Sequence, residues 1–245
     1  MNRVLILGAT SPIARALALR FAADGARLYL AARNADEVRR VAEDVSVRAG
    51  VPALSGTFDA SDFASHDEFI RRAAGALGGL DGVVLCFGTL GDEDVAQTDP
   101  AAALDTLHQN FTGAVSLITL AARHLEQQRS GFIIVIGSVA GERGRKRNYV
   151  YGSAKGALAL FAQGLRGRLA ASGVHVMTVK LGTVDTRMTW GREGALLTIA
   201  PTKAADLIYA AYRKRAEVIY VPWFWRFIMG AVRSIPESRF KRLNF

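Results

Sequence analysis

The sequence has 245 residues, of which 50% are hydrophobic and 22% charged, and this composition excludes an intrinsically disordered chain. Its 31 basic and 22 acidic residues give a formal net charge of +9, and eight bases but only two acids fall within 213–245. A basic excess confined to one segment argues against a general nucleic-acid-binding surface and favours a surface element directed at anionic lipid or phosphate.

A single cysteine, Cys86, excludes an internal disulfide and is typical of a reducing compartment. The opening segment 1–8 is too short in apolar residues for a signal-peptide core, and no stretch reaches the roughly 18 apolar residues that a membrane-spanning helix requires. We therefore expect a cytoplasmic protein.

Short apolar runs alternate with segments of helical periodicity along the whole chain. The runs predict seven strands, at 3–7, 27–31, 53–58, 82–87, 132–136, 174–180 and 218–221. The segments between them include 13–21 and 151–169, each followed by a glycine where a helix would end. This alternation predicts one doubly wound, Rossmann-type α/β domain over 1–245, with a parallel sheet covered on both faces.

The first strand runs into a turn of small residues at 8–14 that opens a helix. In this fold class, backbone N–H groups at such a turn hold a pyrophosphate. We expect the site to include Gly8, Thr10, Ser11 and Ile13. A purely structural turn is the alternative, because the full glycine fingerprint is absent and Pro12 has no N–H to offer.

The second strand is followed by Arg33, where a site that prefers NAD carries an acidic residue for the ribose hydroxyls. The planar guanidinium of Arg33 suits a 2′-phosphate, so NADPH is favoured and NADH remains the second choice. A solvated loop charge is the alternative. Asp59, after the third strand, is expected to accept a hydrogen bond from the adenine amino group, or else to serve as a turn or N-cap residue.

Tyr151 and Lys155 are four residues apart at the start of a predicted helix and therefore share one face. An ammonium about 4 Å from a phenolate stabilises it by about 4 kcal/mol at an effective dielectric of about 20, which lowers the tyrosine pKa. Ser138, at the end of the fifth strand, can donate a second hydrogen bond to a developing alkoxide. Asn110, a polar residue in an apolar helix pattern, can hold a water that links Lys155 to solvent.

We predict that these four residues converge on a substrate carbonyl that receives its proton from Tyr151. Each of these residues, taken singly, also has a structural explanation. Tyr151 and Lys155 fit a helix pair, Ser138 fits a cap at the end of a strand, and Asn110 fits a buried polar residue.

Together, these features resemble the short-chain dehydrogenase/reductase family over essentially the whole chain. The resemblance is carried by the 8–14 turn, Asp59, Phe87-Gly88, Asn110, Ser138, Tyr151, Lys155 and the 181–186 segment. It implies NAD(P)H-dependent chemistry, with Gly88 beside the cofactor, Thr186 at the nicotinamide carboxamide, a substrate loop over 187–201, and a homo-oligomer. Residues that depart from the usual family pattern are Pro12, Ala14, Leu181 and the 85–87 segment.

Further segments, at 87–92, 141–152 and 220–243, resemble the branch of the family that reduces decaprenylphosphoryl-2-keto-ribose. This resemblance implies a keto-sugar on a polyprenyl phosphate as substrate, an arabinose-type product for cell-envelope polysaccharide, and a flavin oxidase as partner. One alternative is a reductase of ketoacyl, steroid or polyketide carbonyls. An alternative of another class is a non-catalytic nucleotide-binding scaffold at the membrane.

Two basic segments fit an anionic lipid-linked substrate. Arg143, Arg145, Lys146 and Arg147 directly precede Tyr151 and are predicted to clamp the substrate phosphate, with a solvated basic loop as the alternative. The tail 222–245 places aromatic and aliphatic residues between arginines, which predicts an amphipathic helix lying on the inner face of an anionic membrane. A lid over the pocket or a subunit interface is the alternative for this tail. The four histidines lack ligand spacing, and no metal is expected.

Overall fold

The structure is a computed structural model that describes residues 2–189 and 197–243. In these residues, seven parallel strands form one sheet in the order β3-β2-β1-β4-β5-β6-β7. The strands are β1 (Arg3–Leu7), β2 (Arg27–Ala32), β3 (Ala53–Thr57), β4 (Gly82–Leu85), β5 (Gly131–Ser138), β6 (Val174–Leu181) and β7 (Val218–Val221). The predicted fold class is therefore confirmed.

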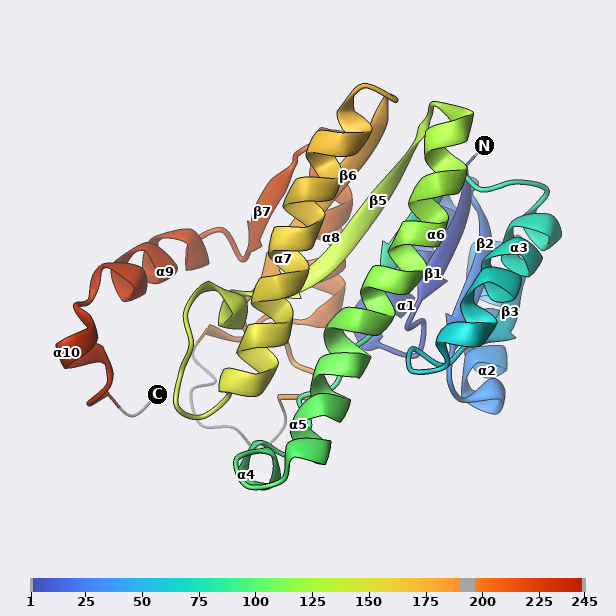
Figure 1. Cartoon of the computed structure of the whole chain (residues 1–245). Coiled ribbons are helices and arrows are strands. Elements are labelled where there is room, and N and C mark those ends of the chain that lie inside the picture. The colour runs from blue at the N-terminus through green and yellow to red at the C-terminus, as the bar shows by residue number, and fades with distance from the viewer. Residues whose placement is uncertain (1, 190–196, 244–245) are drawn as a thin grey trace.

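Helices cover both faces of this sheet (Figure 1). One face carries α1 (Pro12–Ala23), α2 (Ala35–Ala49) and α8 (Pro201–Arg213), and the other carries α3 (His66–Leu77), α6 (Gly113–Gln128) and α7 (Tyr149–Ala170). Shorter elements lie at the carboxyl ends of the strands: the 3-10 turns η1 (Phe63–Ser65) and η3 (Val139–Glu142), the π-helix η2 (His108–Thr112), α4 (Glu93–Ala96) and α5 (Pro100–Leu107).

The central strands are apolar runs because they are buried on both faces of the sheet, whereas the edge strands β3 and β7 are partly exposed. Along β1, Val4 and Ile6 belong to the hydrophobic core under α1 and α8, whereas Leu5 and Leu7 belong to the core under α3 and α6. Successive side chains of a strand point to opposite faces, so a fully buried parallel strand needs an unbroken apolar run. The predicted runs have this character, and β7 matches its predicted bounds.

The direction of chain crossover reverses beside β1, which pairs with β2 on one side and with β4 on the other. The connection that follows β1 crosses one face of the sheet, and the connection that follows β4 crosses the other face. A crevice therefore opens between the carboxyl ends of β1 and β4. The fold therefore places its binding site at the ends of β1 and β4.

The carboxyl-terminal tail leaves the edge of the sheet after β7 and forms α9 (Trp225–Ser234) and α10 (Glu237–Phe240), beside the loop that joins η3 to α7 (Figure 1). The helix predicted from residue 222 begins at Trp225. In the described part of the chain, no helix combines the length and apolar character needed to cross a membrane.

The side chain of Arg143 connects this tail to the rest of the domain through hydrogen bonds. Its guanidinium donates hydrogen bonds to the carbonyl oxygens of Val232 at 2.6 Å and Ile235 at 2.7 Å, and to the Glu237 carboxylate at 2.9 Å. Its Cζ atom also lies 3.7 Å from the centre of the Phe240 ring. Only 14% of the Arg143 side chain is exposed, so it forms a structural anchor between the loop and both tail helices.

A buried carboxylate adds a second connection to the tail. Glu142, whose side chain is 4% exposed, forms an ion pair with Lys180 of β6 and accepts a hydrogen bond from the Tyr220 hydroxyl at 3.1 Å. Its other oxygen lies 3.4 Å from the Arg233 guanidinium of α9. The tail is thus joined to the segment that directly precedes the helix carrying Tyr151.

Candidate active site

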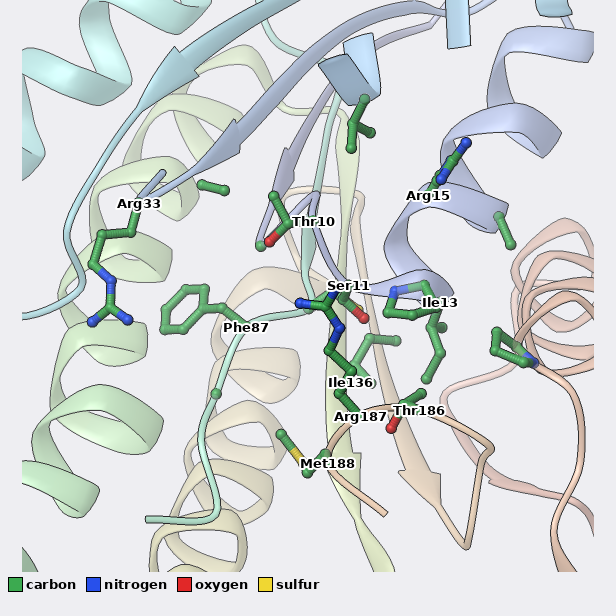
Figure 2. Close-up of a pocket in the computed structure, with 18 of the residues that line it drawn as sticks. Thr10, Ser11, Ile13, Arg15, Arg33, Phe87, Ile136, Thr186, Arg187 and Met188 are labelled. Atoms are coloured by element: carbon green, nitrogen blue, oxygen red, sulfur yellow. The ribbon is translucent and has the colours of Figure 1, made fainter. Parts of the chain in front are cut away.

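A cleft of about 1180 Å³ opens at the carboxyl ends of the central strands (Figure 2). All ten residues predicted to bind a cofactor line this cleft: Gly8, Thr10, Ser11, Ile13, Arg33, Asp59, Gly88, Tyr151, Lys155 and Thr186. They come from segments spread over most of the chain and meet because parallel strands end at one edge of the sheet.

The turn after β1 packs closely and brings the start of α1 to the cleft. Gly8 has φ +83°, and its N–H and that of Ala9 donate to the Ala31 carbonyl oxygen at 2.8 and 3.0 Å. A Cβ at Gly8 would lie 2.7 Å from Cβ of Phe87, so only glycine lets the turn pass this close to the segment after β4. With Pro12 at its first position, α1 begins at the cleft, where the N–H of Ile13, a cleft-lining residue of its first turn, has no acceptor within the helix.

Arginines surround the end of the cleft near β2. Figure 2 shows Arg33 beside Phe87 on one side of the view and Arg15 on the other. The Asn34 side chain accepts from Glu37 N at 3.0 Å and so caps α2, while Arg33 lines the cleft. The sequence analysis missed Arg15, Arg40 and Arg48, which also line the cleft, because nothing in the pattern separates them from surface charges.

Asp59 lies in the cleft wall with its carboxylate already engaged by the local turn. Its Oδ1 accepts from Ser61 N at 2.9 Å, and its carbonyl oxygen lies 2.8 Å from Nε2 of the buried His66. The predicted turn role and the predicted adenine contact are therefore compatible. In the residues that the structure describes, no cluster of three or more His, Cys, Asp or Glu side chains could hold a metal ion.

Tyr151 and Lys155 are both buried in the cleft wall, on the first turns of α7. The Lys155 Nζ atom lies 5.7 Å from the centre of the Tyr151 ring and 3.4 Å from the Phe87 carbonyl oxygen. Burial lowers the pKa of Lys155 to about 8, because the ammonium loses hydration. It is still mostly protonated at neutral pH, as its predicted effect on Tyr151 requires.

Cys86 also lines the cleft, and its thiol does not form an ion pair with the Lys155 ammonium. Burial raises the pKa of its thiol to about 11, so the thiol is neutral at physiological pH. Its Sγ atom lies 3.8 Å from the Ser11 hydroxyl oxygen. The ammonium of Lys155 therefore acts on Tyr151 without a neighbouring thiolate.

Asn110 occupies the centre of the π-helix η2, between α5 and α6. Its Oδ1 accepts from Thr89 N at 3.1 Å, and its Nδ2 donates to the carbonyl oxygens of Thr89 at 2.7 Å and Thr106 at 2.8 Å. The buried amide thus holds the segment after β4 against the helix. The predicted water relay through Asn110 remains a prediction.

Gly88 brings Asn110 and Lys155 together. A Cβ at Gly88 would collide with Asn110 Oδ1 and lie 2.9 Å from Lys155 Nζ. The missing side chain therefore lets both groups reach the same stretch of backbone. This packing also explains why β4 ends at Leu85, two residues before the predicted end: the chain leaves the sheet to meet Asn110.

Ser138 is the last residue of β5, one residue beyond Ile136 and Gly137, which line the cleft. Its hydroxyl oxygen accepts from Ala140 N at 3.1 Å. Because that bond uses an oxygen lone pair, the hydroxyl proton stays available to a substrate oxygen.

The four basic residues before Tyr151 are not gathered at one point. Arg143 holds the tail, Arg145 and Lys146 line a separate hollow against α10, and Arg147 is exposed. The predicted substrate loop begins with Arg187 and Met188 in the cleft wall, and its 190–196 part lies outside the described residues.

Comparison with known proteins identifies the family. Residues 2–195 match the short chain dehydrogenase family. The chain is a short-chain dehydrogenase/reductase. An uncharacterized oxidoreductase of Mycobacterium tuberculosis is 37% identical to this short-chain dehydrogenase/reductase over 240 residues, which cover 98% of this chain and 96% of that relative. One from Streptomyces coelicolor is 38% identical over 241 residues, covering 98% and 95%.

Solved structures share the fold of this short-chain dehydrogenase/reductase. A short-chain dehydrogenase from Sphingobium yanoikuyae in complex with NADPH superimposes with a TM-score of 0.82 at 25% identity, covering 97% of this chain and 98% of that one. Levodione reductase gives a TM-score of 0.80 at 20% identity, covering 90% and 95%. The protein is therefore an oxidoreductase of a family whose members bind NAD(P)H.

The residues of the cleft fit such a dinucleotide. The turn at Gly8 brings the first turn of α1 to the cleft, and arginines line the β2 end. A nicotinamide cofactor, when bound, supplies the hydride. The predicted catalytic residues Tyr151 and Lys155 line the cleft, Ser138 directly follows Gly137 of its wall, and the Asn110 amide holds Thr89 in the segment after β4.

Proposed function

We propose that this short-chain dehydrogenase/reductase uses NADPH to reduce a ketone on a sugar that is joined to a polyprenyl phosphate, giving an arabinose-type product. The chemical part rests on Tyr151 and Lys155, which lie together in the cleft wall, and on Ser138, which directly follows Gly137 of that wall. The lipid-linked substrate rests on the tail that borders this cleft and on the sequence resemblance to reductases of this class.

The proton transfer follows from the site. The Tyr151 hydroxyl donates to the carbonyl oxygen as it becomes an alkoxide, and the Ser138 hydroxyl donates a second hydrogen bond. The Lys155 ammonium stabilises the phenolate that remains on Tyr151. Asn110 keeps the Phe87 carbonyl and Lys155 in register through its bonds to Thr89.

The preference for NADPH rests on the charge at the β2 end of the cleft. Arg33 lines the cleft, and no acidic residue follows β2 before Asn34, which is committed to capping α2. A guanidinium can form charge-assisted, bidentate hydrogen bonds to a phosphate, whereas it offers ribose hydroxyls no acceptor.

One observation carries the substrate class. The Trp225 indole lies so close to Gly182 that a Cβ there would collide with it, and Gly182 directly follows Leu181 of the cleft wall. The tail helix α9 therefore starts at the rim of the cleft, with Trp223 and Phe227 exposed. A rim that joins a polar cleft to exposed aromatic side chains suits a substrate with a reactive sugar and a long apolar chain.

The test supplies purified protein with NADPH or NADH and three ketones: a polyprenyl-phosphoryl 2-keto-pentose, the same keto-sugar without lipid and phosphate, and a ketoacyl thioester. Consumption of reduced cofactor is followed by absorbance. We expect the lipid-linked sugar to give the highest kcat/KM, by at least about tenfold, and NADPH to be preferred. A higher kcat/KM for the thioester would overturn the proposal in favour of ketoacyl reduction.

A keto-sugar of this kind must be supplied by oxidation of the corresponding alcohol on the same carrier. We therefore propose a flavin oxidase of the lipid-linked pentose as the preceding enzyme. Mixing such an oxidase with the reductase and the unoxidised sugar should give NADPH consumption that depends on both proteins. Consumption without the oxidase would contradict this order.

A further inference from the structure

A second cavity lies outside the cleft, between the loop that precedes α7 and the short helix α10. Its volume is about 270 Å³. Three cationic side chains line it, Arg145, Lys146 and Lys241, together with the less polar side chains of Tyr149, Phe240 and Leu243. We call this cavity the basic hollow.

The charge of the basic hollow favours an anion. Glu237 is the single carboxylate in its described walls, so the walls carry a net charge of +2 from Arg145, Lys146 and Lys241 against Glu237. The Glu237 carboxylate also binds Arg143, at 2.9 Å. Cations gathered around a concave surface raise the local concentration of anions, and phosphate oxygens accept from both arginine and lysine.

The basic hollow is separate from the reaction centre. Tyr149 lines the hollow, whereas Tyr151 lines the cleft. Residues two positions apart on an α-helix are rotated by about 200° around its axis. The side chains of Tyr149 and Tyr151 therefore leave α7 on opposite sides. A phosphate in the hollow therefore sits on the far side of the first turn of α7 from the reacting carbonyl.

Exposed aromatic side chains lie on the same tail, at the start of α9. Trp223 and Phe227 are 69% and 68% exposed, and their ring centres are 5.9 Å apart. Leu243 is exposed as well. The residues between them include several exposed cations, namely Arg226, Arg233, Arg239, Lys241 and Arg242, against the single acid Glu237. Aromatic side chains interleaved with cations fit the interface of an anionic bilayer, where rings enter the headgroup layer and cations meet lipid phosphates.

We propose that the tail is an anionic-membrane docking surface, in which the basic hollow holds the phosphate of a lipid headgroup while Trp223 and Phe227 enter the interface. This goes beyond the proposed substrate and does not depend on it. Because Arg143 and Glu142 join the tail to the loop before α7, docking fixes the orientation of the whole cleft on the membrane. A lipid-linked substrate would then meet the aromatic rim directly.

The experiment measures co-sedimentation of the full chain with vesicles of phosphatidylcholine alone or of phosphatidylcholine mixed with phosphatidylglycerol, in the absence of any sugar substrate. Wild-type protein should bind the anionic vesicles, lose binding as salt is raised, and bind phosphatidylcholine at least about tenfold more weakly. The variant Lys146→Glu/Lys241→Glu should lose at least about tenfold in partitioning, and so should Trp223→Ser/Phe227→Ser.

Matched controls separate the surface from general charge. The control Lys214→Glu/Arg123→Glu changes the net charge by the same amount as Lys146→Glu/Lys241→Glu. Lys214 is exposed directly after α8 and Arg123 is exposed on α6, so this control should bind vesicles nearly as wild type does. Leu160→Ser removes a side chain that is exposed on α7 and should also have little effect. NADPH binding by each variant shows that the cleft is folded.

Four results would overturn the proposal. These are equal binding to both vesicle types, equal losses in the control and hollow variants, and binding of inorganic phosphate without binding of vesicles. The fourth is a dimer that dissociates in Trp223→Ser/Phe227→Ser while no vesicle binds, which would assign the face to a second copy of the chain. Since no ketone is present, failure here leaves the proposed substrate untouched.

Discussion

The Lys155 ammonium lies 5.7 Å from the centre of the Tyr151 ring, and both side chains are buried in the wall of one cleft. The helical spacing of four residues sets the shared face, and the Phe87 carbonyl 3.4 Å from Nζ holds the lysine beside the ring. The pair therefore has one acidic proton directed at the cleft and one positive charge to stabilise its loss.

Tyr151→Phe removes that proton and keeps the aromatic ring. General acid catalysis contributes about 10²–10⁴-fold, so we expect kcat to fall by at least about 100-fold, a much larger effect than any on NADPH affinity. The matched control is Tyr149→Phe, which removes a hydroxyl two residues away, on the other side of the helix. Steady-state kinetics and cofactor titration decide the matter, and a kcat within a few-fold of wild type for Tyr151→Phe would refute the acid role.

The lowered pKa of Lys155 predicts a pH limit for reduction. The Lys155 pKa is about 8, so the ammonium is lost as the pH rises through that value and the phenolate of Tyr151 is no longer stabilised. We expect kcat/KM, which reports the free enzyme, to decline above about pH 8. Lys155→Met should be slow throughout and lack this limb, and an unchanged limb in that variant would assign the titration to another group.

The same shift has a consequence for stability. The Lys155 pKa is lower in the folded protein, about 8, than its ordinary value of 10.5, so the unfolded chain binds more protons between those values. The free energy of unfolding contributed by this group therefore rises with pH from about 8 to about 10.5. Urea unfolding at several pH values should show this rise in wild type, and Lys155→Met should have a smaller one.

Arg33→Ser tests cofactor choice. Loss of hydrogen bonds to a charged phosphate costs about 1.5–3 kcal/mol, which raises the KM for NADPH by about 10- to 100-fold while the KM for NADH stays within a few-fold. Arg39→Ser is the control, because Arg39 is exposed and pairs only locally with Asp36, at 2.8 Å. Equal effects of Arg33→Ser on both cofactors would contradict a 2′-phosphate contact.

Gly88→Ala tests the packing around Asn110. The added methyl group would collide with Asn110 Oδ1 and crowd Lys155 Nζ at 2.9 Å, so we expect kcat to fall at least about tenfold and the protein to lose about 1–3 kcal/mol of stability. Gly164→Ala in α7 meets nothing within 4 Å and should instead gain about 0.5–1 kcal/mol. Thermal unfolding should shift in opposite directions in the two variants, and only Gly88→Ala should lower kcat.

Arg143→Gln tests the anchor of the tail. It removes a buried cation that binds two carbonyl oxygens, a carboxylate and an aromatic ring, which should cost about 2–4 kcal/mol of unfolding free energy. Trypsin should then cut within 226–242 faster than in wild type. Arg147→Gln, at an exposed neighbour, should change neither measurement, and equal protection of the tail in Arg143→Gln would show that other contacts hold it.

The central strands were predictable because they are buried on both faces, and a run of apolar residues is the pattern that such burial demands. The first and last strands have their predicted bounds, Arg3–Leu7 and Val218–Val221. The fourth ends earlier than predicted, because the segment after Leu85 packs on Asn110 and Lys155, groups that lie 25 and 70 residues further along the chain.

Local pattern was also enough to single out Tyr151 and Lys155, since a helix turns a spacing of four into a shared face. It did not reveal the π-helix around Asn110, whose side chain binds Thr89. It also did not reveal that the basic residues of 143–147 contact different parts of the structure. Arg143 turned toward the tail while Lys146 joined Lys241 in the basic hollow, ninety-five residues away along the chain. Residue spacing determines which side chains are neighbours within one helix or strand, whereas contacts between distant segments depend on how the elements pack. The Arg143 contacts with the tail and the basic hollow are both of the second kind, so only the tertiary structure decides them.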